Sequence, residues 1–201
     1  GRNGKMVLEL NSTFAVQTTS NRLDLLNADE FATYQKIIDP LYTQGTEDTD
    51  WQDLIYGTGL QTSHDINISG GGENGSFSIG VGYFKETSVL PVENFQRYSL
   101  RTQVDQQIGA FRFGVNSVMN YSITNAAGIG LYGNLSATPM LNPYNPDGSL
   151  KTAVSMPLDD FWVTTRGTVS ALGDSRVNDQ LDFGTYNNLY GEVAIPGIEG
   201  L

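Results

Sequence analysis

Glycine patterns and one histidine are the features of this sequence whose residue types and spacing suggest chemistry. The pattern G-x-G-x-x-G occurs at Gly70, Gly72 and Gly75, and again over residues 128–133. A dinucleotide site needs this pattern between a strand and a helix, because the helix N-terminus holds the pyrophosphate. A strand-like run follows the first pattern, and a stretch with prolines and no helical periodicity follows the second. Neither pattern therefore predicts a nucleotide site.

The lone histidine, His64, precedes Asp65 and has serines nearby, which are the residue types of a hydrolytic triad. It stands at the start of a strand-like run, and a residue of the polar strand face is the simpler interpretation. We therefore expect no catalytic residues and no enzyme activity.

Acidic residues gather in the first half of the chain. Glu47, Asp48, Asp50 and Asp53 are hard oxygen ligands at a spacing that suits Ca²⁺. They lack the turn glycine and the closing glutamate of an EF-hand loop, and Asp50 also suits the N-cap of a short helix. Calcium is thus the one metal candidate, and no other cofactor is expected.

Composition excludes several classes of protein. The 201 residues include 11 basic and 22 acidic side chains, a net charge of −11, with no cysteine and one histidine. Disulfides, thiolate metal sites and multi-histidine sites are therefore absent. An acidic chain lacks the basic surface by which proteins bind nucleic acid. Apolar residues make up 39% of the chain, but no run reaches the roughly 18 residues of a membrane-spanning helix.

Alternation of apolar and polar residues with a period of two predicts β-strands along much of the chain. Within 97–108, Tyr98, Leu100 and Val104 share one face, and Arg97 and Arg101 share the other. The expected strands are 6–18, 65–69, 76–84, 97–108, 111–121 and 187–195. The sequence therefore predicts an all-β protein of antiparallel strands.

The connections between these strands alternate in length. Residues 19–64, 85–95 and 123–186 form the longer ones, and 70–75 and 109–110 are short turns. Outer-membrane barrels alternate in this way, because their periplasmic turns are short and their extracellular loops long. Several strands also approach the roughly 9–11 residues that cross a bilayer. The pattern favours a transmembrane β-barrel segment over a soluble sandwich, whose strands usually have about 5–6 residues.

The long connections carry signals of their own. Asn27 as N-cap with Glu30 three residues later predicts a helix over 27–40. Asp50 is the expected N-cap of a second helix over 50–56, and Asn145 to Gly148 is an expected turn.

Six strands are too few to close a membrane barrel, because the small ones have about eight. An open sheet would leave two unpaired edges in hydrocarbon. We therefore expect residues 1–201 to be part of one barrel domain of a longer polypeptide, with an oligomeric barrel as the alternative.

Several stretches stand in the order in which a known family carries similar ones. They are DLLNADEF at 24–31, TDWQDLIY at 49–56, HDINISGG at 64–71, RYSLR at 97–101 and NPYNPDGS at 142–149. Together they resemble the early barrel region of SusC/RagA-type TonB-dependent outer-membrane transporters. The resemblance implies about six strands of a barrel with about 22 strands and a plug in its lumen.

The resemblance also implies a function and partners. Such transporters import glycans or peptides across the outer membrane of Gram-negative, Bacteroidota-like cells, with energy from the TonB complex. A SusD-like surface lipoprotein usually covers the extracellular mouth, and outer-membrane lipid surrounds the barrel.

The resemblance brings two groups of candidate site residues. Arg97, Arg101 and Arg112, near Asp105, would face the lumen and contact the plug, with simple solvation as the alternative. Aromatic residues of the third long connection would contact a ligand or a lid, or pack within the loop: Tyr132, Tyr144, Phe161 and Trp162.

Two other functions stay open at this stage. One is a structural or scaffolding outer-membrane barrel of a secretion or surface assembly. The other is a soluble extracellular β-sandwich that binds carbohydrate. A second sheet packed on Phe77, Ile79, Val81, Phe111 and Phe113 would favour the sandwich.

Overall fold

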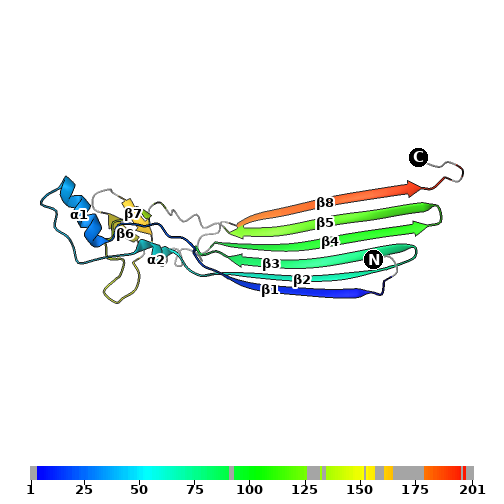
Figure 1. The fold of residues 1–201 in the computed structure, drawn as a ribbon, viewed down its shortest axis with the longest axis horizontal. Helices are drawn as coiled ribbons and strands as arrows, with labels where there is room; N and C mark the ends of the chain where they lie inside the picture. The colour runs from blue at the N-terminus through cyan, green and yellow to red at the C-terminus, as the bar shows by residue number, and fades with distance from the viewer. Residues whose placement is uncertain are drawn as a thin grey trace.

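The strands form one broad antiparallel sheet in a computed structural model of the chain (Figure 1). The structure describes residues 4–90, 93–125, 132, 135–151, 153–156, 161–164, 179–195 and 197. The strand order is β1-β2-β3-β4-β5-β8. The strands are β1 (Val7–Gln17), β2 (Gly59–Gly72), β3 (Gly75–Thr87), β4 (Asn94–Ile108), β5 (Phe111–Asn125) and β8 (Asp179–Val193). The sheet is open, with β1 and β8 at its edges, and this confirms the predicted antiparallel barrel segment.

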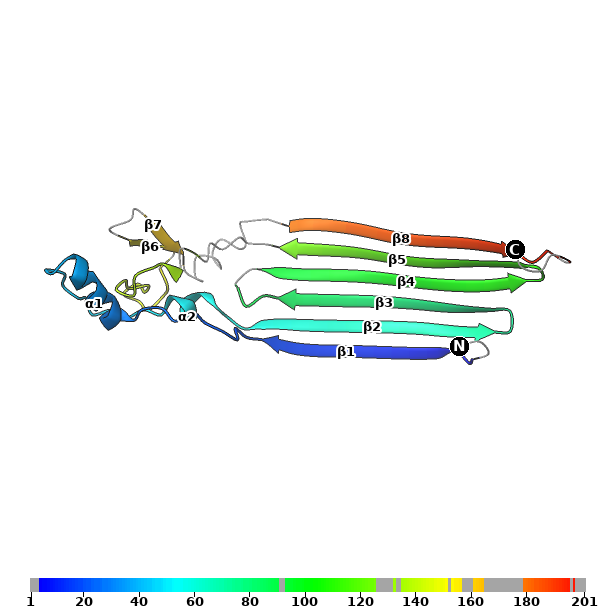
Figure 2. The ribbon, with the colours of Figure 1, turned by 45° about the horizontal axis from the view of Figure 1, so that its top comes forward.

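Tight turns close one end of the sheet. β2 pairs with β3 as far as Gly72 and Gly75, so only two residues make that turn. β4 and β5 pair as far as Ile108 and Phe111, and Gly109 between them has φ 57°. Glycine adopts this left-handed conformation without the clash that a Cβ would cause. The longer connections all leave the opposite end, as the alternation of lengths predicted (Figure 2).

Two strands extend well beyond their predicted bounds. β2 begins at Gly59 rather than at residue 65, and β8 begins at Asp179 rather than at residue 187. Thr62 and His64 place polar groups on the apolar face, so the alternation fades although pairing with β1 and β3 continues. Residues 179–186, expected in the third connection, pair fully with β5. Pairing with neighbours, which one strand's pattern does not reveal, sets these ends.

Short helices lie in the connection between β1 and β2, as predicted. α1 (Ala28–Ile38) begins with a capping box, in which Asn27 accepts from the backbone of Glu30 and Glu30 accepts from that of Asn27. α2 (Trp51–Ile55) has Asp50 as its N-cap. The connection from β5 to β8 contains a hairpin that the sequence did not suggest, made of β6 (Ala153–Met156) and β7 (Phe161–Thr164).

The first and third connections pack together beyond the end of the sheet, and we call the packed residues 22–56, 137–151 and 153–154 the loop unit. Trp51 and Val154 are buried against each other, with Leu54 and Leu141 beside them. The indole Nε1 of Trp51 donates to the Thr138 carbonyl at 2.9 Å. Two connections that are far apart in the sequence thus share one small core.

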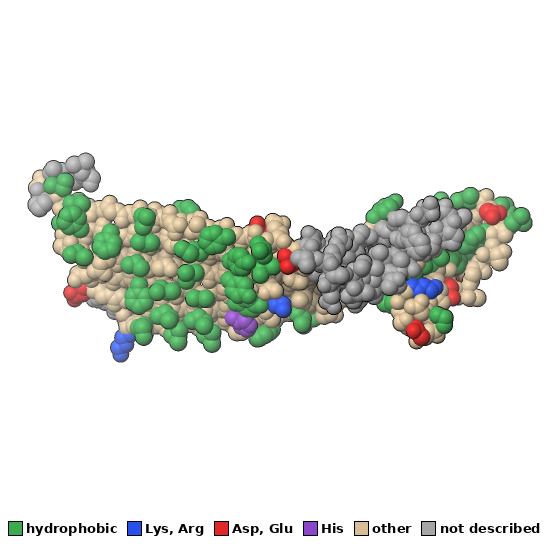
Figure 3. Space-filling model, turned by 180° about the vertical axis from the view of Figure 1, so that it is seen from behind, with side chains coloured by type: hydrophobic (Ala, Val, Ile, Leu, Met, Phe, Trp, Pro, Cys, Tyr) green, Lys and Arg blue, Asp and Glu red, His purple; other side chains and the backbone are tan. Residues whose placement is uncertain are grey.

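The apolar face of the sheet has no cover among the described residues. Phe77, Ile79, Val81, Phe111 and Phe113 are all exposed there, from 38% to 60%. Figure 3 shows hydrophobic side chains along this face. The small β6–β7 sheet lies in the third connection and not on this face. The described residues therefore do not form the two-layer sandwich that was one alternative.

An aromatic row crosses this face near the loop end. Strand register aligns Ser12, His64, Tyr83, Tyr98 and Tyr121. The ring centroids of Tyr83 and Tyr98 are 5.1 Å apart, and those of Tyr98 and Tyr121 are 6.4 Å apart. Phe183 of β8 continues the row. Such a row suits a membrane–water interface, where tyrosine buries its ring and keeps its hydroxyl wet.

The apolar band below this row has the height of a bilayer core. Between Tyr98 and Ile108 the strand β4 advances ten residues. At about 3.3 Å per residue and a tilt of about 40°, this corresponds to roughly 25 Å, the usual height of the lipid-facing band of a barrel. None of the described helices is long and apolar enough to cross a membrane.

Candidate functional site on the polar face of the sheet

The polar face carries the predicted charged residues. Register places Asp65 of β2, Arg101 and Asp105 of β4, and Arg112 of β5 on this one side. The period of two fixes the side for every residue of a strand, so Tyr98 and Leu100 lie on the other. The sequence therefore predicted correctly that these charged side chains share the polar face.

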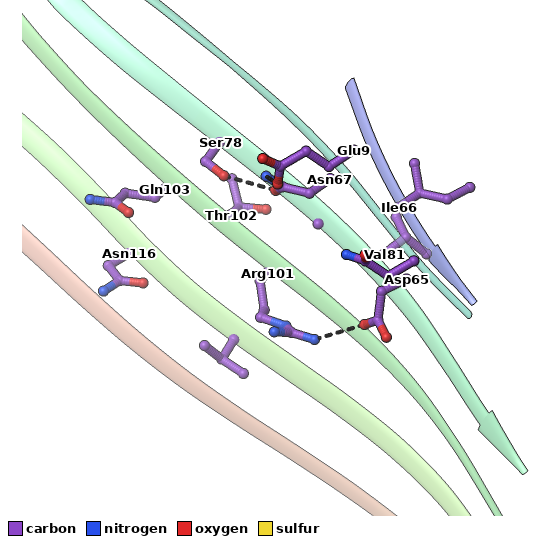
Figure 4. A pocket seen from close by; sticks show the side chains of 13 residues that line it. Glu9, Asp65, Ile66, Asn67, Ser78, Val81, Arg101, Thr102, Gln103 and Asn116 are labelled. Carbon is purple, nitrogen blue, oxygen red and sulfur yellow. Dashed lines mark hydrogen bonds and ion pairs between the residues drawn. The ribbon is translucent and has the colours of Figure 1, made fainter. Parts of the chain in front are cut away.

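A hollow of about 600 Å³ lies in the middle of this face (Figure 4). Polar side chains of neighbouring strands line it: Glu9, Asn11, Asp65, Asn67, Ser78, Arg101, Gln103 and Asn116. Gly80 also lines the hollow, and a Cβ there would come no closer than 3.5 Å to any neighbour. The hollow therefore reaches down to the backbone of β3, because Gly80 has no side chain to fill it.

A chain of hydrogen bonds runs along one side of the hollow. Asn67 Nδ2 donates to Glu9 Oε2 at 3.4 Å, and Ser78 Oγ donates to Asn67 Oδ1 at 3.0 Å. The three residues come from β1, β2 and β3, so the chain crosses the strands. Glu9 is exposed, and of its two carboxylate oxygens Oε2 is the one that accepts from Asn67.

An ion pair closes the other side of the hollow. Arg101 Nη2 lies 3.1 Å from Asp65 Oδ1, although β3 separates their strands. Gly82 of β3 makes this reach possible, because a Cβ at Gly82 would lie 2.7 Å from Asp65 Oδ1 and 2.5 Å from Ser99 Oγ. The glycine between the two charged residues thus positions the pair, and the sequence analysis did not identify this role.

A second charged cluster lies nearer the turn end. Arg112 binds Asp105 through Nε at 3.3 Å and Nη2 at 3.0 Å, a two-point contact of guanidinium and carboxylate. The hydroxyl of Tyr190 also donates to Asp105, and the ring of Tyr190 lies over Gly114. Asp105 and Arg112, predicted to lie near each other, are thus brought together. Tyr190 belongs to the residues 187–195 that were predicted as a strand, but no sequence signal pointed to this contact.

The third predicted arginine has a different neighbour. The guanidinium carbon of Arg97 lies 5.4 Å from the centroid of the Phe84 ring, a cation–π contact. The ring of Phe95 packs beside Phe84 at 5.9 Å. Arg97 is therefore not part of either acidic pair, and this aromatic pair on the polar face was missed by the sequence analysis.

His64 and Asp65 lie on opposite faces of β2, so they form no catalytic pair. His64 is on the apolar face rather than the polar face that we expected, because it is two residues from Ile66. Its Nδ1 lies 2.8 Å from Ser12 Oγ, and its ring stacks on Tyr83 at 6.4 Å. Asp65 is instead bound to Arg101.

The acidic residues of the first connection have partners within the protein rather than facing one common point. Glu47 accepts from Asn142 Nδ2, and Asp48 accepts from the backbone of Ala28. Asp50 caps α2 and, with Asp53, forms ion pairs with Arg22. The described residues contain no group of three or more His, Cys, Asp or Glu side chains placed to hold a metal ion. Calcium binding at these carboxylates stays a prediction.

Electrostatic contacts also order the loop unit. The hydrogen bond from Arg22 to Asp53, together with the nearby charge of Asp50, raises the pKa of the Arg22 guanidinium. The side-chain amide of Gln52 accepts from the backbone N–H of Leu23 at 2.9 Å and donates to its carbonyl at 2.8 Å. The start of the first connection, at Arg22 and Leu23, is therefore tied to α2 by polar contacts.

The aromatic candidates of the third connection are not gathered in one place by the described structure. Tyr132 and Tyr144 are exposed, at 81% and 47%. Tyr144 forms an isolated bridge with Leu150, next to the turn at Asn145–Gly148 that was predicted. Phe161 and Trp162 belong to β7, and their side chains lie outside the described part of the structure. A ligand or lid contact by these residues stays a prediction.

Known proteins resemble this chain in sequence over about half of its length. No family profile matches it. It is 39% identical over 117 residues, 58% of the chain, to TonB-dependent receptor P3 of Formosa agariphila. It is 32% identical over 103 residues to TonB-dependent receptor SusC of Bacteroides thetaiotaomicron. The chain spans only 12% and 10% of the length of these two relatives.

Solved structures resemble the chain over nearly its full length. The RagAB peptide transporter matches with a TM-score of 0.76 at 19% identity, covering 98% of this chain and 27% of that chain. The RagAB peptide importer in its open-open state matches with a TM-score of 0.78 at 18% identity, again over 27% of that chain. At such identities the likeness establishes the fold. Together with the sequence relatives, it confirms the resemblance to SusC/RagA-type TonB-dependent transporters.

Proposed function

We propose that this chain forms part of the barrel wall of an outer-membrane nutrient importer that works in a TonB-dependent way. The observation that carries the proposal is the two-sidedness of the sheet. One face has a hydrophobic band with the height of a bilayer core and an aromatic row at its edge. The other has a polar hollow and paired charges. A wall between lipid and a polar lumen needs these two faces.

The likeness to TonB-dependent receptors supports transport rather than a purely structural role. The relatives are named as receptors, and the structural neighbours as a peptide transporter. In this proposal the chain is one part of a single larger barrel domain with a plug. It has no enzyme activity, and its wall contributes contacts while the complete barrel performs uptake.

The polar face supports a contact with a plug that fills the lumen. Arg97 and Arg101 of β4 are exposed on this face, and Arg112 and Asp105 form a pair at the turn end. The pair of Arg101 and Asp65 is exposed, and an exposed ion pair contributes little to stability, about 0–1 kcal/mol. Such charges are therefore better explained as polar contacts for a protein segment in the lumen than as stabilisers of the sheet.

The loop unit supports a contact with a SusD-like surface lipoprotein. α1 leaves its outer side uncovered by described residues, with Tyr34, Ile37 and Ile38 from 55% to 76% exposed and Leu41 89% exposed. Phe31 of the same helix is half-buried and packs edge-on against Tyr42. An exposed apolar patch of this kind favours a protein partner.

The imported nutrient is proposed at the level of a glycan or a peptide. The structural neighbours transport peptides, but they are under 20% identical to this chain. Exposed aromatic residues of the third connection, Tyr132 and Tyr144, suit either ligand, since rings stack on sugars and pack on peptide side chains.

Uptake by the complete transporter tests the proposal. The gene for the full-length protein is deleted in its host and restored on a plasmid, and cells are offered fluorescent glycans and peptides of defined length. We expect uptake of one class to be lost on deletion, restored by the plasmid, and lost again in a strain without TonB. Unchanged uptake of every nutrient together with a defect in surface-protein assembly would instead establish the scaffolding role.

A further inference from the structure

One basic side chain interrupts the apolar face of the sheet. Among the residues of the six described strands, register places only Lys85 and Asp179 as charged residues on that face, and Asp179 begins β8. Lys85 is exposed, and none of the ion pairs among the described residues includes it. Glu86, its acidic neighbour in sequence, points to the polar face.

Polar residues flank Lys85 on both neighbouring strands. Thr62 of β2 and Gln96 of β4 are its paired residues across the sheet. Tyr83 and Tyr98, with ring centroids 5.1 Å apart, lie one step below on the same face. An ammonium group, a hydroxyl, an amide and two phenol groups therefore gather on three adjacent strands. Figure 3 shows a basic side chain beside the only histidine at the loop end of the hydrophobic face.

The position of Lys85 relative to the aromatic row sets its depth in a membrane. It follows Tyr83 by two residues toward the loops, about 7 Å along the strand. Tyrosine rings of such rows sit at the level of lipid headgroups, so Lys85 lies where the charged groups of the outer leaflet are. A lysine at the centre of the band would be costly, whereas at this height it can bind an anion.

We propose that Lys85, with Thr62 and Gln96 beside it, binds the phosphate of a phosphorylated glycolipid in the outer leaflet. The inference rests on the proposed membrane location. The ammonium binds the phosphate as a point charge. The hydroxyl and amide donate to its remaining oxygens or to sugar hydroxyls, and Tyr83 and Tyr98 pack against the sugar. Charge complementarity selects an anionic headgroup over a zwitterionic one, because the patch contains no acidic residue from the described strands.

Lipid binding to the purified full-length protein tests this site. Native mass spectrometry counts bound lipid A in detergent and, in parallel, lipid A whose phosphates have been removed by phosphatase. The variants are Lys85→Gln, Lys85→Met and Lys85→Arg, with Lys36→Gln on the exposed side of α1 as the matched control. Migration of unheated and heated samples on a gel shows which variants form the folded barrel.

We expect Lys85→Gln and Lys85→Met to bind phosphorylated lipid A about tenfold more weakly, as for the loss of one charge-assisted hydrogen bond. Lys85→Arg and Lys36→Gln should bind it like the unaltered protein. Equal affinity in all variants, or an equal loss for phosphorylated and dephosphorylated lipid, would overturn the phosphate site. Absence of the full-length protein from the outer-membrane fraction of its host would overturn the proposed function. That measurement is separate from lipid binding by the purified protein, so the two failures can be told apart.

Discussion

The indole N–H of Trp51 donates to the main-chain carbonyl of Thr138, 2.9 Å away, across 87 positions of the sequence. This bond joins α2 of the first connection to the third connection. The backbone N–H of Thr49 adds a bond to Pro139 at 2.9 Å, and its hydroxyl donates to Leu141 at 2.7 Å. The two connections therefore form one packed unit beyond the end of the sheet.

Replacing Trp51 should open the loop unit without unfolding the sheet. Trp51 is 2% exposed, and Trp51→Ala leaves a cavity that typically costs about 3–5 kcal/mol. The sheet has its own strand pairing, so only the connections should loosen. Limited proteolysis of the full-length protein should then cut within residues 22–56 or 137–154 at least tenfold faster, while the heated and unheated gel migration stays unchanged.

Trp51→Phe separates the two contributions of the tryptophan. Phenylalanine keeps most of the apolar contact with Val154 and loses the N–H that binds Thr138. We expect an intermediate rate of proteolysis, because one lost hydrogen bond costs about 1 kcal/mol. Equal cleavage of the unaltered protein and both variants would show that the two connections do not form a common core.

Gly82 should resist replacement, whereas Gly80 should accept it. In Gly82→Ala the new methyl group meets Asp65 and Ser99, and their side chains must turn away from Arg101. We expect a loss of about 1 kcal/mol in the free energy of unfolding, since crowding moves flexible side chains and breaks one exposed ion pair. Gly80→Ala, with its nearest neighbour at 3.5 Å, should be neutral. Urea unfolding in detergent measures both.

A double mutant shows whether the effect of Gly82→Ala passes through the ion pair. In an Asp65→Asn background the ion pair is already lost. Gly82→Ala should therefore lower the free energy of unfolding by less in that background than in the unaltered protein, and the difference is the coupling energy of the two sites. Additive effects would contradict the role assigned to Gly82.

Acid should loosen the turn at Asn145–Gly148 through Asp147. Hydrogen bonds from the hydroxyl and the backbone of Ser149 lower the pKa of Asp147 below its ordinary value of 3.8. At a pH above the ordinary pKa of the unfolded chain, the ionised carboxylate contributes its full stabilisation to the folded turn. This stabilisation is lost as the pH falls through the lower pKa that the group has in the folded turn. Relative to its intrinsic rate, exchange of the Ser149 amide hydrogen should accelerate as the pH falls below 3.8, the ordinary pKa of Asp147, and Asp147→Asn should abolish this pH dependence.

The predicted and unpredicted features of this chain differ in the range of the interactions that produce them. The strand centres followed from the alternation around Leu100 and Val104, because one buried face imposes a period of two. The helix caps at Asn27 and Asp50 also followed, since they involve residues within three positions. The early start of β2 did not, because Thr62 and His64 interrupt the alternation and only the neighbouring strands keep them paired.

The charged residues of the candidate site were predicted, and so was the nearness of Asp105 to Arg112, but the partner of Arg101 was not. Sequence alone placed Arg101 on the polar face, yet its bond to Asp65 crosses a whole strand and depends on Gly82. The contact of Trp51 with Thr138 joins two connections whose pairing has no local signal. Contacts of this kind arise from the arrangement of the sheet as a whole, which periodicity within one strand does not encode.

The two faces of β5 provide the sharpest test of a membrane wall. Met119 lies on the apolar face in one row with Leu100 and Val81, and Asn120 next to it lies on the polar face. In Met119→Arg the guanidinium enters the lipid-facing band, and the expected cost is about 2–4 kcal/mol. In Asn120→Arg the same group enters the polar face and should cost less than about 0.5 kcal/mol. Folding of the full-length protein into lipid vesicles at graded urea concentrations measures both, and a reversed order would place the lipid on the other side of the sheet.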